Sequence, residues 1–157
     1  MVDSYDKFLF LDIDGVLNNT NHKESDSPLT YPGSAFSKDN VDAFNKLLED
    51  IPDIQVIVCS SWRFDSNLQT VFDYVGIKCH IEGITPCLAY SYSQDGYSRG
   101  DEVKQWLNSC PSKNYRYCIL DDCNDYRDEQ EPYLVLLDER KGFRMEDIEK
   151  VKKILNE

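Results

Sequence analysis

Two carboxylates end an apolar run near the N-terminus, in the stretch FLFLDIDGVL. A single residue separates Asp12 from Asp14, and Gly15 follows Asp14 directly. Like charges at this spacing repel each other, and burying them is costly without a positive partner. The pair is therefore either a solvated strand end or part of a site that holds a cation.

Further polar residues follow two other apolar runs of strand length. They are Ser60, Ser61 and Arg63 after the second run, and Asp121, Asp122 and Asp125 after the third. The carboxyl ends of parallel strands lie at one edge of a sheet, where ligands bind in open α/β folds. So many carboxylates at one edge need a hard cation among them, and Mg²⁺ prefers one or two carboxylates together with a substrate phosphate. The pattern predicts a Mg²⁺ site of this kind.

Strand-length apolar runs alternate along the chain with segments of helical periodicity. The expected strands lie at 7–12, 54–60, 115–121 and 133–138, with a weaker candidate at 78–81. The expected helices lie at 41–51, 68–75, 103–107 and 148–155, and the second should begin at a Ser66 cap and end at Gly76. Short strands that alternate with helices favour right-handed crossovers. We therefore expect an α/β fold, with a parallel sheet covered by helices on both faces.

Two segments lack periodicity, at 18–37 and 83–99. Long aperiodic segments in a compact domain are often functional. The second is rich in tyrosine, and Tyr90, Tyr92 and Tyr97 could either stack on bases or cover the sheet. No shift in composition marks a second domain, so we expect one domain over residues 1–157.

The charge and composition limit the partners of the protein. A net charge of -12 disfavours broad attraction to nucleic acid or anionic membranes, but leaves a small phosphorylated substrate or a nucleic-acid end open. We find no membrane-length apolar segment and no signal peptide, so we expect a cytoplasmic protein without membrane contact. Six scattered cysteines without a CxxC pair argue against a zinc site and a disulfide scaffold. Nothing in the pattern indicates an oligomeric state.

The motifs together resemble those of the haloacid dehalogenase (HAD) superfamily of phosphatases. The similar stretches are DIDGVL at 12–17, VCSS at 58–61, and ILDD at 119–122 followed by Asp125. Arg99, before the helical stretch GDEVKQWL, is similar to the basic residue of the third motif, and Lys104 is the alternative. The order of motifs spans nearly the whole chain. The patterns SSWR and RGxEVxxWL are similar to the HAD modules associated with RNA-repair proteins.

The resemblance implies roles for individual residues. Asp12 would be the nucleophile that forms an aspartyl-phosphate, and Asp14 would be the general acid and then the base. Arg99 would offset the charge of the phosphoryl group. Ser61 would donate a hydrogen bond to it, with Ser60 as the alternative hydroxyl.

The resemblance also implies the metal ligands and the substrate contacts. Mg²⁺ would be held by the Asp12 carboxylate, the Asp14 main-chain carbonyl and Asp122, helped by Asp121 or Asp125. Asp125 could instead cap the start of a helix. The choice between Asp121 and Asp122 as direct ligand stays open. On the substrate side we expect Ser60, Gly15, which lets the backbone turn, and Arg63, which could instead form a surface salt bridge.

The HAD resemblance implies a three-layer Rossmann-like fold with a central parallel sheet. Superfamily caps are inserted after the first motif or between the second and third, and both intervals are short here, so we expect no separate cap domain. The implied activity is Mg²⁺-dependent phosphomonoester hydrolysis, on nucleic-acid or nucleotide phosphate ends. The alternatives are a small-metabolite phosphatase and a catalytically retired HAD fold that only binds.

Overall fold

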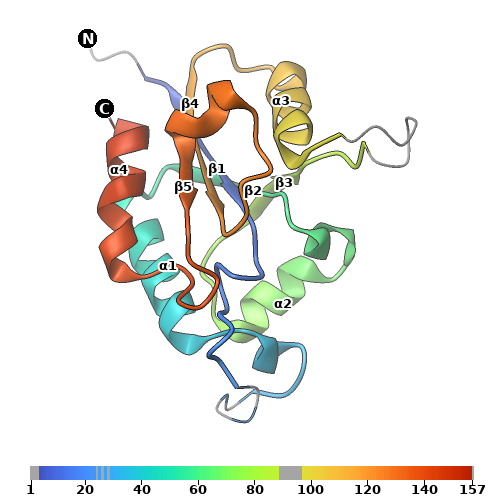
Figure 1. The fold of residues 1–157 in the computed structure, drawn as a ribbon, viewed down its shortest axis with the longest axis vertical. Coiled ribbons are helices and arrows are strands. Elements are labelled where there is room, and N and C mark those ends of the chain that lie inside the picture. The colour runs from blue at the N-terminus through green and yellow to red at the C-terminus, as the bar shows by residue number, and fades with distance from the viewer. Residues whose placement is uncertain (1–3, 24, 26, 28, 89–96, 157) are drawn as a thin grey trace.

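Five parallel strands form the centre of the protein (Figure 1). The structure is a computed structural model that describes residues 4–23, 25, 27, 29–88 and 97–156. The strands are β1 (Asp6–Leu11), β2 (Ile54–Val58), β3 (Ile81–Ile84), β4 (Tyr115–Asp121) and β5 (Leu134–Leu136). Their order in the sheet is β3-β2-β1-β4-β5, and every neighbouring pair is parallel. The predicted α/β fold with a parallel sheet is confirmed.

The central strand is β1, and its sequence explains this position. Residues Phe8 to Leu11 are all buried, as expected for a strand covered on both faces. In the sheet register Leu11 lies opposite both Val58 of β2 and Leu120 of β4. The residues that follow these three positions therefore emerge at the same edge of the sheet.

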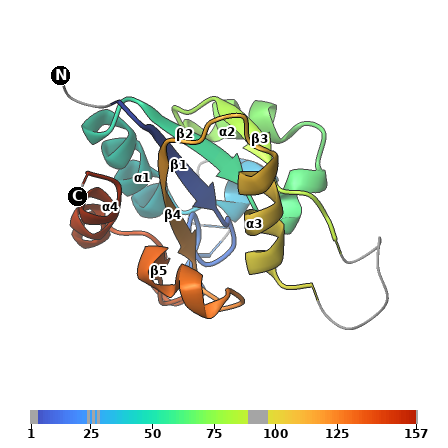
Figure 2. The same ribbon diagram turned by 90° about the horizontal axis from the view of Figure 1, so that it is seen from above.

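Helices cover both faces of the sheet, which makes the three layers (Figure 2). Helices α1 (Lys38–Asp50), α2 (Leu68–Val75) and α4 (Ile148–Asn156) pack on the face to which Leu9 and Leu11 point. Helix α3 (Arg99–Ser109) packs on the opposite face, where Trp106 contacts Phe8 and Phe10 with ring centroids 5.0 and 5.5 Å apart. The alternation of leucine and phenylalanine along β1 thus divides the core between the two faces.

Some predicted boundaries are wrong. The weak strand predicted at 78–81 begins only at Ile81, and α3 is longer than predicted because it starts at Arg99. Gly76 ends α2 with φ +84°, as predicted, but Asn67 rather than Ser66 precedes the helix. Tyr90 and Tyr92 lie outside the described residues.

The connections that could hold a cap are short. Between β1 and α1 the described residues form turns and one short 3-10 helix, Gly33–Ala35. Neither this connection nor the described part of the one between β3 and α3 holds a separate domain, in agreement with the sequence. Among the described residues, no helix has the length and apolar character needed to span a membrane.

Candidate active site

Three carboxylates meet at the carboxyl edge of the sheet, where β1 and β4 end. Asp12, Asp121 and Asp122 each offer an oxygen within 4.8 Å of the others. Asp12 is 3% exposed and Asp121 is fully buried, whereas Asp122 is half-buried. The register brings them together, since Asp12 directly follows β1 and its main-chain N–H donates to Leu120 of β4.

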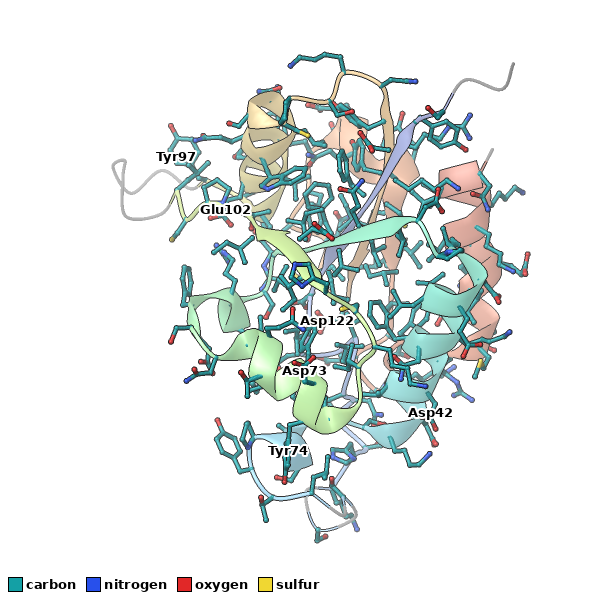
Figure 3. All side chains as sticks on the ribbon, turned by 180° about the vertical axis from the view of Figure 1, so that it is seen from behind. Asp42, Asp73, Tyr74, Tyr97, Glu102 and Asp122 are labelled. Carbon is teal, nitrogen blue, oxygen red and sulfur yellow. The ribbon has the colours of Figure 1, made fainter. Side chains whose placement is uncertain are left out.

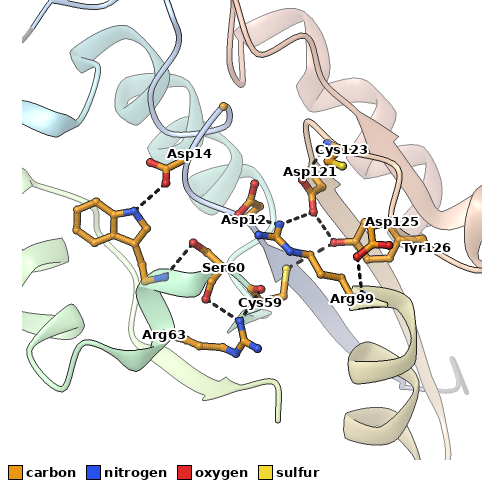
Figure 4. A network of polar contacts seen from close by, with 12 residues as sticks. Asp12, Asp14, Cys59, Ser60, Arg63, Arg99, Asp121, Cys123, Asp125 and Tyr126 are labelled. Carbon is orange, nitrogen blue, oxygen red and sulfur yellow. Dashed lines mark hydrogen bonds and ion pairs between the residues drawn. The ribbon is translucent and has the colours of Figure 1, made fainter. Parts of the chain in front are cut away.

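One arginine bridges two of these carboxylates (Figure 4). Arg99 Nη1 lies 3.0 Å from Asp12 Oδ1 and 2.8 Å from Asp121 Oδ2. Arg99 is the first residue of α3, whose start is fixed by reciprocal hydrogen bonds between Ser98 and Asp101. Lys104, the alternative cation in the sequence, is exposed on the same helix and makes no ion pair with this cluster.

The carboxylate cluster carries more negative charge than Arg99 offsets. Burial, reinforced by the charge of Asp121, raises the pKa of Asp12 to about 8. Burial also acts to raise the pKa of Asp121, but the hydrogen bond from Tyr126 and the charge of Arg99 outweigh it and lower that pKa. Burial and the adjacent Asp121 raise the pKa of Asp122. This arrangement accommodates a further positive charge.

The donor set of the cluster fits a hard divalent cation. All three side chains offer oxygen, and neither histidine of the chain lies in the cluster. Asp121 already accepts three hydrogen bonds, from the main-chain N–H of Cys123, from Arg99 and from Tyr126. Among the described residues, Asp122 accepts from neither an arginine nor a tyrosine, and interacts instead with the carboxyl groups of Asp12 and Asp121 and with its own main-chain N–H, which leaves it better suited to a metal.

Gly15 makes room for Asp122. Its φ is +81°, in the region that favours glycine, and a Cβ at this position would overlap the Asp122 carboxylate. The sequence predicts the turn at Gly15 and assigns it to the substrate side. In the structure, the Asp122 carboxylate fills the space that a side chain at position 15 would need.

Asp14 lies on the solvent side of the cluster, held by two donors. Its Oδ2 accepts from Trp62 Nε1 at 3.2 Å and its Oδ1 accepts from Asn18 Nδ2 at 2.9 Å. Asn18 also accepts from the Gly15 N–H at 2.8 Å, so the turn and the carboxylate share one support. Neither Trp62 nor Asn18 is predicted as a site residue, because nothing in their spacing indicates a contact with Asp14.

The two candidate hydroxyls differ in their environment. Ser60 is buried, and its Oγ accepts the main-chain N–H of Trp62 at 3.1 Å. Ser61 is exposed at the first residue of a short 3-10 helix, Ser61–Phe64. A phosphate that approaches from solvent therefore meets Ser61 more easily than Ser60.

Arg63 does not join the carboxylates and is paired elsewhere, so its expected contact with substrate stays a prediction that its surroundings do not favour. It is 8% exposed, and its guanidinium donates to the main-chain carbonyls of Cys59, Ser60 and Thr85. Its Nη2 lies 3.1 Å from Glu102 Oε2. Glu102 belongs to the first turn of α3 (Figure 3). Glu102 also accepts the main-chain N–H of Leu88 at 3.0 Å. The pair therefore connects the 3-10 helix after β2, the segment that follows β3 and the first turn of α3.

Asp125 also lies outside the cluster of Asp12, Asp121 and Asp122, so its expected role as a metal ligand stays a prediction that the geometry does not favour. Its Oδ2 accepts the main-chain N–H of Arg99 at 3.0 Å, and its carbonyl oxygen accepts that of Gly100 at 3.0 Å. It therefore binds the unpaired donors at the start of α3, the alternative that the residue type also allows.

Tyr126 is a site residue that the sequence does not indicate. Its hydroxyl donates to Asp121 Oδ2 at 2.6 Å and lies 3.8 Å from Cys59 Sγ. A single tyrosine after an acidic stretch carries no signal of such a contact, because the contact depends on how the chain folds back after β4.

Comparison with known protein families gives one match. The family model described as the HAD domain in Swiss Army Knife RNA repair proteins matches residues 8–148, from within β1 to the first residue of α4. No curated protein and no solved structure gives a significant match.

Proposed function

Because the chain belongs to the family of HAD domains in Swiss Army Knife RNA repair proteins, we propose that it is a Mg²⁺-dependent phosphomonoester hydrolase. The observation that carries the proposal is the contact of Arg99 with both Asp12 and Asp121 at the end of the central strand. This contact places the nearly buried Asp12 carboxylate beside the Arg99 guanidinium, at the edge of the sheet where α/β folds bind ligands.

Asp12 is the nucleophile in this proposal. One of its carboxylate oxygens forms a bond to phosphorus while the bond from phosphorus to the leaving oxygen breaks, which gives an aspartyl-phosphate. Asp14 protonates the leaving oxygen. In the second half, Asp14 takes a proton from water as the water oxygen attacks phosphorus, which releases inorganic phosphate and restores Asp12.

The remaining residues position and stabilise the phosphoryl group. Arg99 offsets the charge that two negative groups bring together at Asp12, and the exposed Ser61 donates a hydrogen bond to a phosphoryl oxygen. Trp62 and Asn18 hold Asp14 at the solvent side, where a leaving group departs. Asp12, Asp122 and the main-chain carbonyl of Asp14 would hold Mg²⁺, which supplies the additional positive charge that phosphoryl transfer needs.

The proposed substrate is a phosphorylated end of a nucleic acid or a nucleotide. The family model comes from domains of RNA repair proteins, and no cap domain stands over the described site. An uncovered site suits a phosphate at the end of a large molecule.

A small-metabolite phosphatase is the second candidate, favoured by the cavity beside Asp14. This cavity of about 340 Å³ includes Asp14, Asp122 and Glu139 in its walls. Among the described residues, no lysine or arginine lines it. Such walls disfavour a leaving group that carries a second phosphate close to the first.

The test is phosphate release from p-nitrophenyl phosphate, a nucleoside monophosphate, and oligoribonucleotides with a 3′- or 5′-phosphate. Wild type is compared with Asp12→Asn, and with Asp39→Asn as an exposed control with the same charge change. We expect Mg²⁺-dependent release that is lost in Asp12→Asn and kept in the control. A preference for oligonucleotides that weakens with salt supports the repair role, and its absence supports the metabolite role. Undiminished release by Asp12→Asn would refute the mechanism.

A further inference from the structure

Tyr126 contacts the carboxylate cluster but has no part in the proposed chemistry. Its hydroxyl donates to Asp121 Oδ2 at 2.6 Å, a short distance that is typical of a hydrogen bond to an ionised carboxylate. Its ring packs against the core under α3, beside residues such as Phe10. A hydroxyl on a packed ring has little freedom to move away from its acceptor.

The hydroxyl of Tyr126 has a fixed direction. A phenol has one hydrogen, and an ionised carboxylate only accepts, so that hydrogen belongs to the bond with Asp121. Cys59 Sγ, 3.8 Å from the same hydroxyl, is then the donor to Tyr126. Figure 4 shows the resulting chain of contacts from Cys59 through Tyr126 to Asp121.

Asp121 Oδ2 is shared between Tyr126 and Arg99. Arg99 Nη1 lies 2.8 Å from this oxygen, and the main-chain N–H of Cys123 donates to Oδ1 at 3.0 Å. Three donors from three directions fix the plane of a carboxylate that is fully buried. The same Nη1 reaches Asp12 at 3.0 Å, so the orientation of Asp121 sets where the guanidinium meets the nucleophile.

We propose that Tyr126 is a positioning residue, whose hydroxyl holds Asp121 against Arg99 and thereby keeps the Arg99 guanidinium beside Asp12. The two adjacent aspartates then differ, because Asp121 is held by Arg99 and Tyr126, whereas Asp122 is paired with neither an arginine nor a tyrosine among the described residues. The inference rests on the proposed function for its kinetic readout, and on the described contacts alone for its structural one.

The kinetic test is Tyr126→Phe, which removes the hydroxyl and keeps the ring. We expect kcat for p-nitrophenyl phosphate to fall about tenfold, as for the loss of one hydrogen bond to a charged group. KM and the Mg²⁺ concentration for half-maximal rate should each stay within about twofold, since the substrate and metal contacts remain. The matched control is Tyr117→Phe, which makes the same change in the same core, where Tyr117 packs on Phe10 and Tyr133, and should keep wild-type kinetics.

A double variant shows whether Tyr126 acts through Asp121. In an Asp121→Asn background, Tyr126→Phe should reduce kcat by less than about twofold, because the group it positions is already altered. A full tenfold loss in that background would overturn the proposal. So would a changed Mg²⁺ requirement with unchanged kcat in Tyr126→Phe, because Tyr126 would then shape a metal ligand.

A stability measurement tests the inference without activity. Tyr126 and Arg99 both bind Asp121 Oδ2, so their effects on urea unfolding should be coupled through that oxygen. In Tyr126→Phe combined with Arg99→Met, the unfolding equilibrium constant should depart more than threefold from the product of the single effects. If wild type releases no phosphate from any substrate, the proposed function fails, while this coupling still decides the inference. Independent effects would overturn it.

Discussion

Replacing Asp12 by asparagine should stabilise the protein when no metal is bound. The carboxylate lies almost buried beside Asp121, and this environment raises its pKa from 3.8 to about 8. At neutral pH the metal-free folded protein therefore takes up a proton that the unfolded chain does not hold. Asparagine has a similar shape and no charge, so it avoids that cost.

The size of the effect follows from the pKa of Asp12. Each unit of difference between the folded and unfolded pKa is worth about 1.4 kcal/mol, so a pKa of about 8 costs roughly 4 kcal/mol at pH 7 relative to a group that does not titrate. Asparagine does not reproduce every contact of the protonated Asp12 carboxyl group with Arg99 and Asp121, which offsets part of the gain. We expect a net stabilisation of about 2 kcal/mol at pH 7.

The sign of the pH dependence is fixed by the raised pKa. The contribution of Asp12 to stability is fully present below pH 3.8, in its protonated form, and is lost as the pH rises toward 8. The stability advantage of Asp12→Asn should therefore grow steadily from pH 4 to pH 8 and then level off.

Urea denaturation in EDTA at pH 5, 6, 7 and 8 measures this difference, with Asp39→Asn as the exposed control. Added Mg²⁺ should stabilise wild type more than Asp12→Asn and so reduce the difference. A variant that is less stable than wild type throughout, or an advantage that is the same at every pH, would refute the reasoning from burial and charge.

Three further substitutions test separate parts of the structure. Glu102→Gln leaves the charge of Arg63 buried without its partner and should lower the free energy of unfolding by about 3 kcal/mol in urea denaturation, with kcat per folded molecule unchanged. Gly15→Ala strains a positive φ and displaces Asp122, so the Mg²⁺ concentration for half-maximal phosphate release should rise at least about tenfold. Asp125→Ala removes the carboxylate that accepts the main-chain N–H of Arg99 at the start of α3, so thermal unfolding should show a loss of about 1 kcal/mol in stability. The Mg²⁺ concentration for half-maximal phosphate release should stay unchanged, since Asp125 lies outside the carboxylate cluster.

The fold could be predicted because its elements follow from local patterns. Apolar runs located β1, β2, β4 and β5, and their alternation with helices implied the parallel sheet. The strand ends were less predictable, since an apolar residue can continue a run after the ladder has stopped. β3 was misplaced because its burial alternates along IEGI, which leaves little apolar signal.

The sequence indicated which carboxylates lie together, because strand ends place them, but it did not indicate contacts that depend on the tertiary structure. The register of β1 and β4 ends both strands at the same edge of the sheet, and this brings together Asp12, Asp121 and Asp122. The pairing of Arg63 was not predictable, because its short distance from Ser60 along the chain says nothing about the direction of the guanidinium. Its partner, Glu102, lies on a helix on the other face of the sheet.

The contacts of Tyr126, Trp62 and Asn18 were missed for the same reason. Each makes a hydrogen bond to a carboxylate that depends on the path of a connecting segment. Residue type alone favours packing for a tyrosine or tryptophan, and a turn for an asparagine. Only the folded arrangement shows that these polar atoms face the site.

The contacts of Glu102 tie the start of α3 to the segment that follows β3. Glu102 accepts the main-chain N–H of Leu88, and Asp101 accepts that of Ser98. Neither carboxylate belongs to the cluster of Asp12, Asp121 and Asp122. The acidic residues near Arg99 thus divide into those that fasten the backbone around it and those that meet at the edge of the sheet, so a substitution can loosen the first set without removing an oxygen from the second.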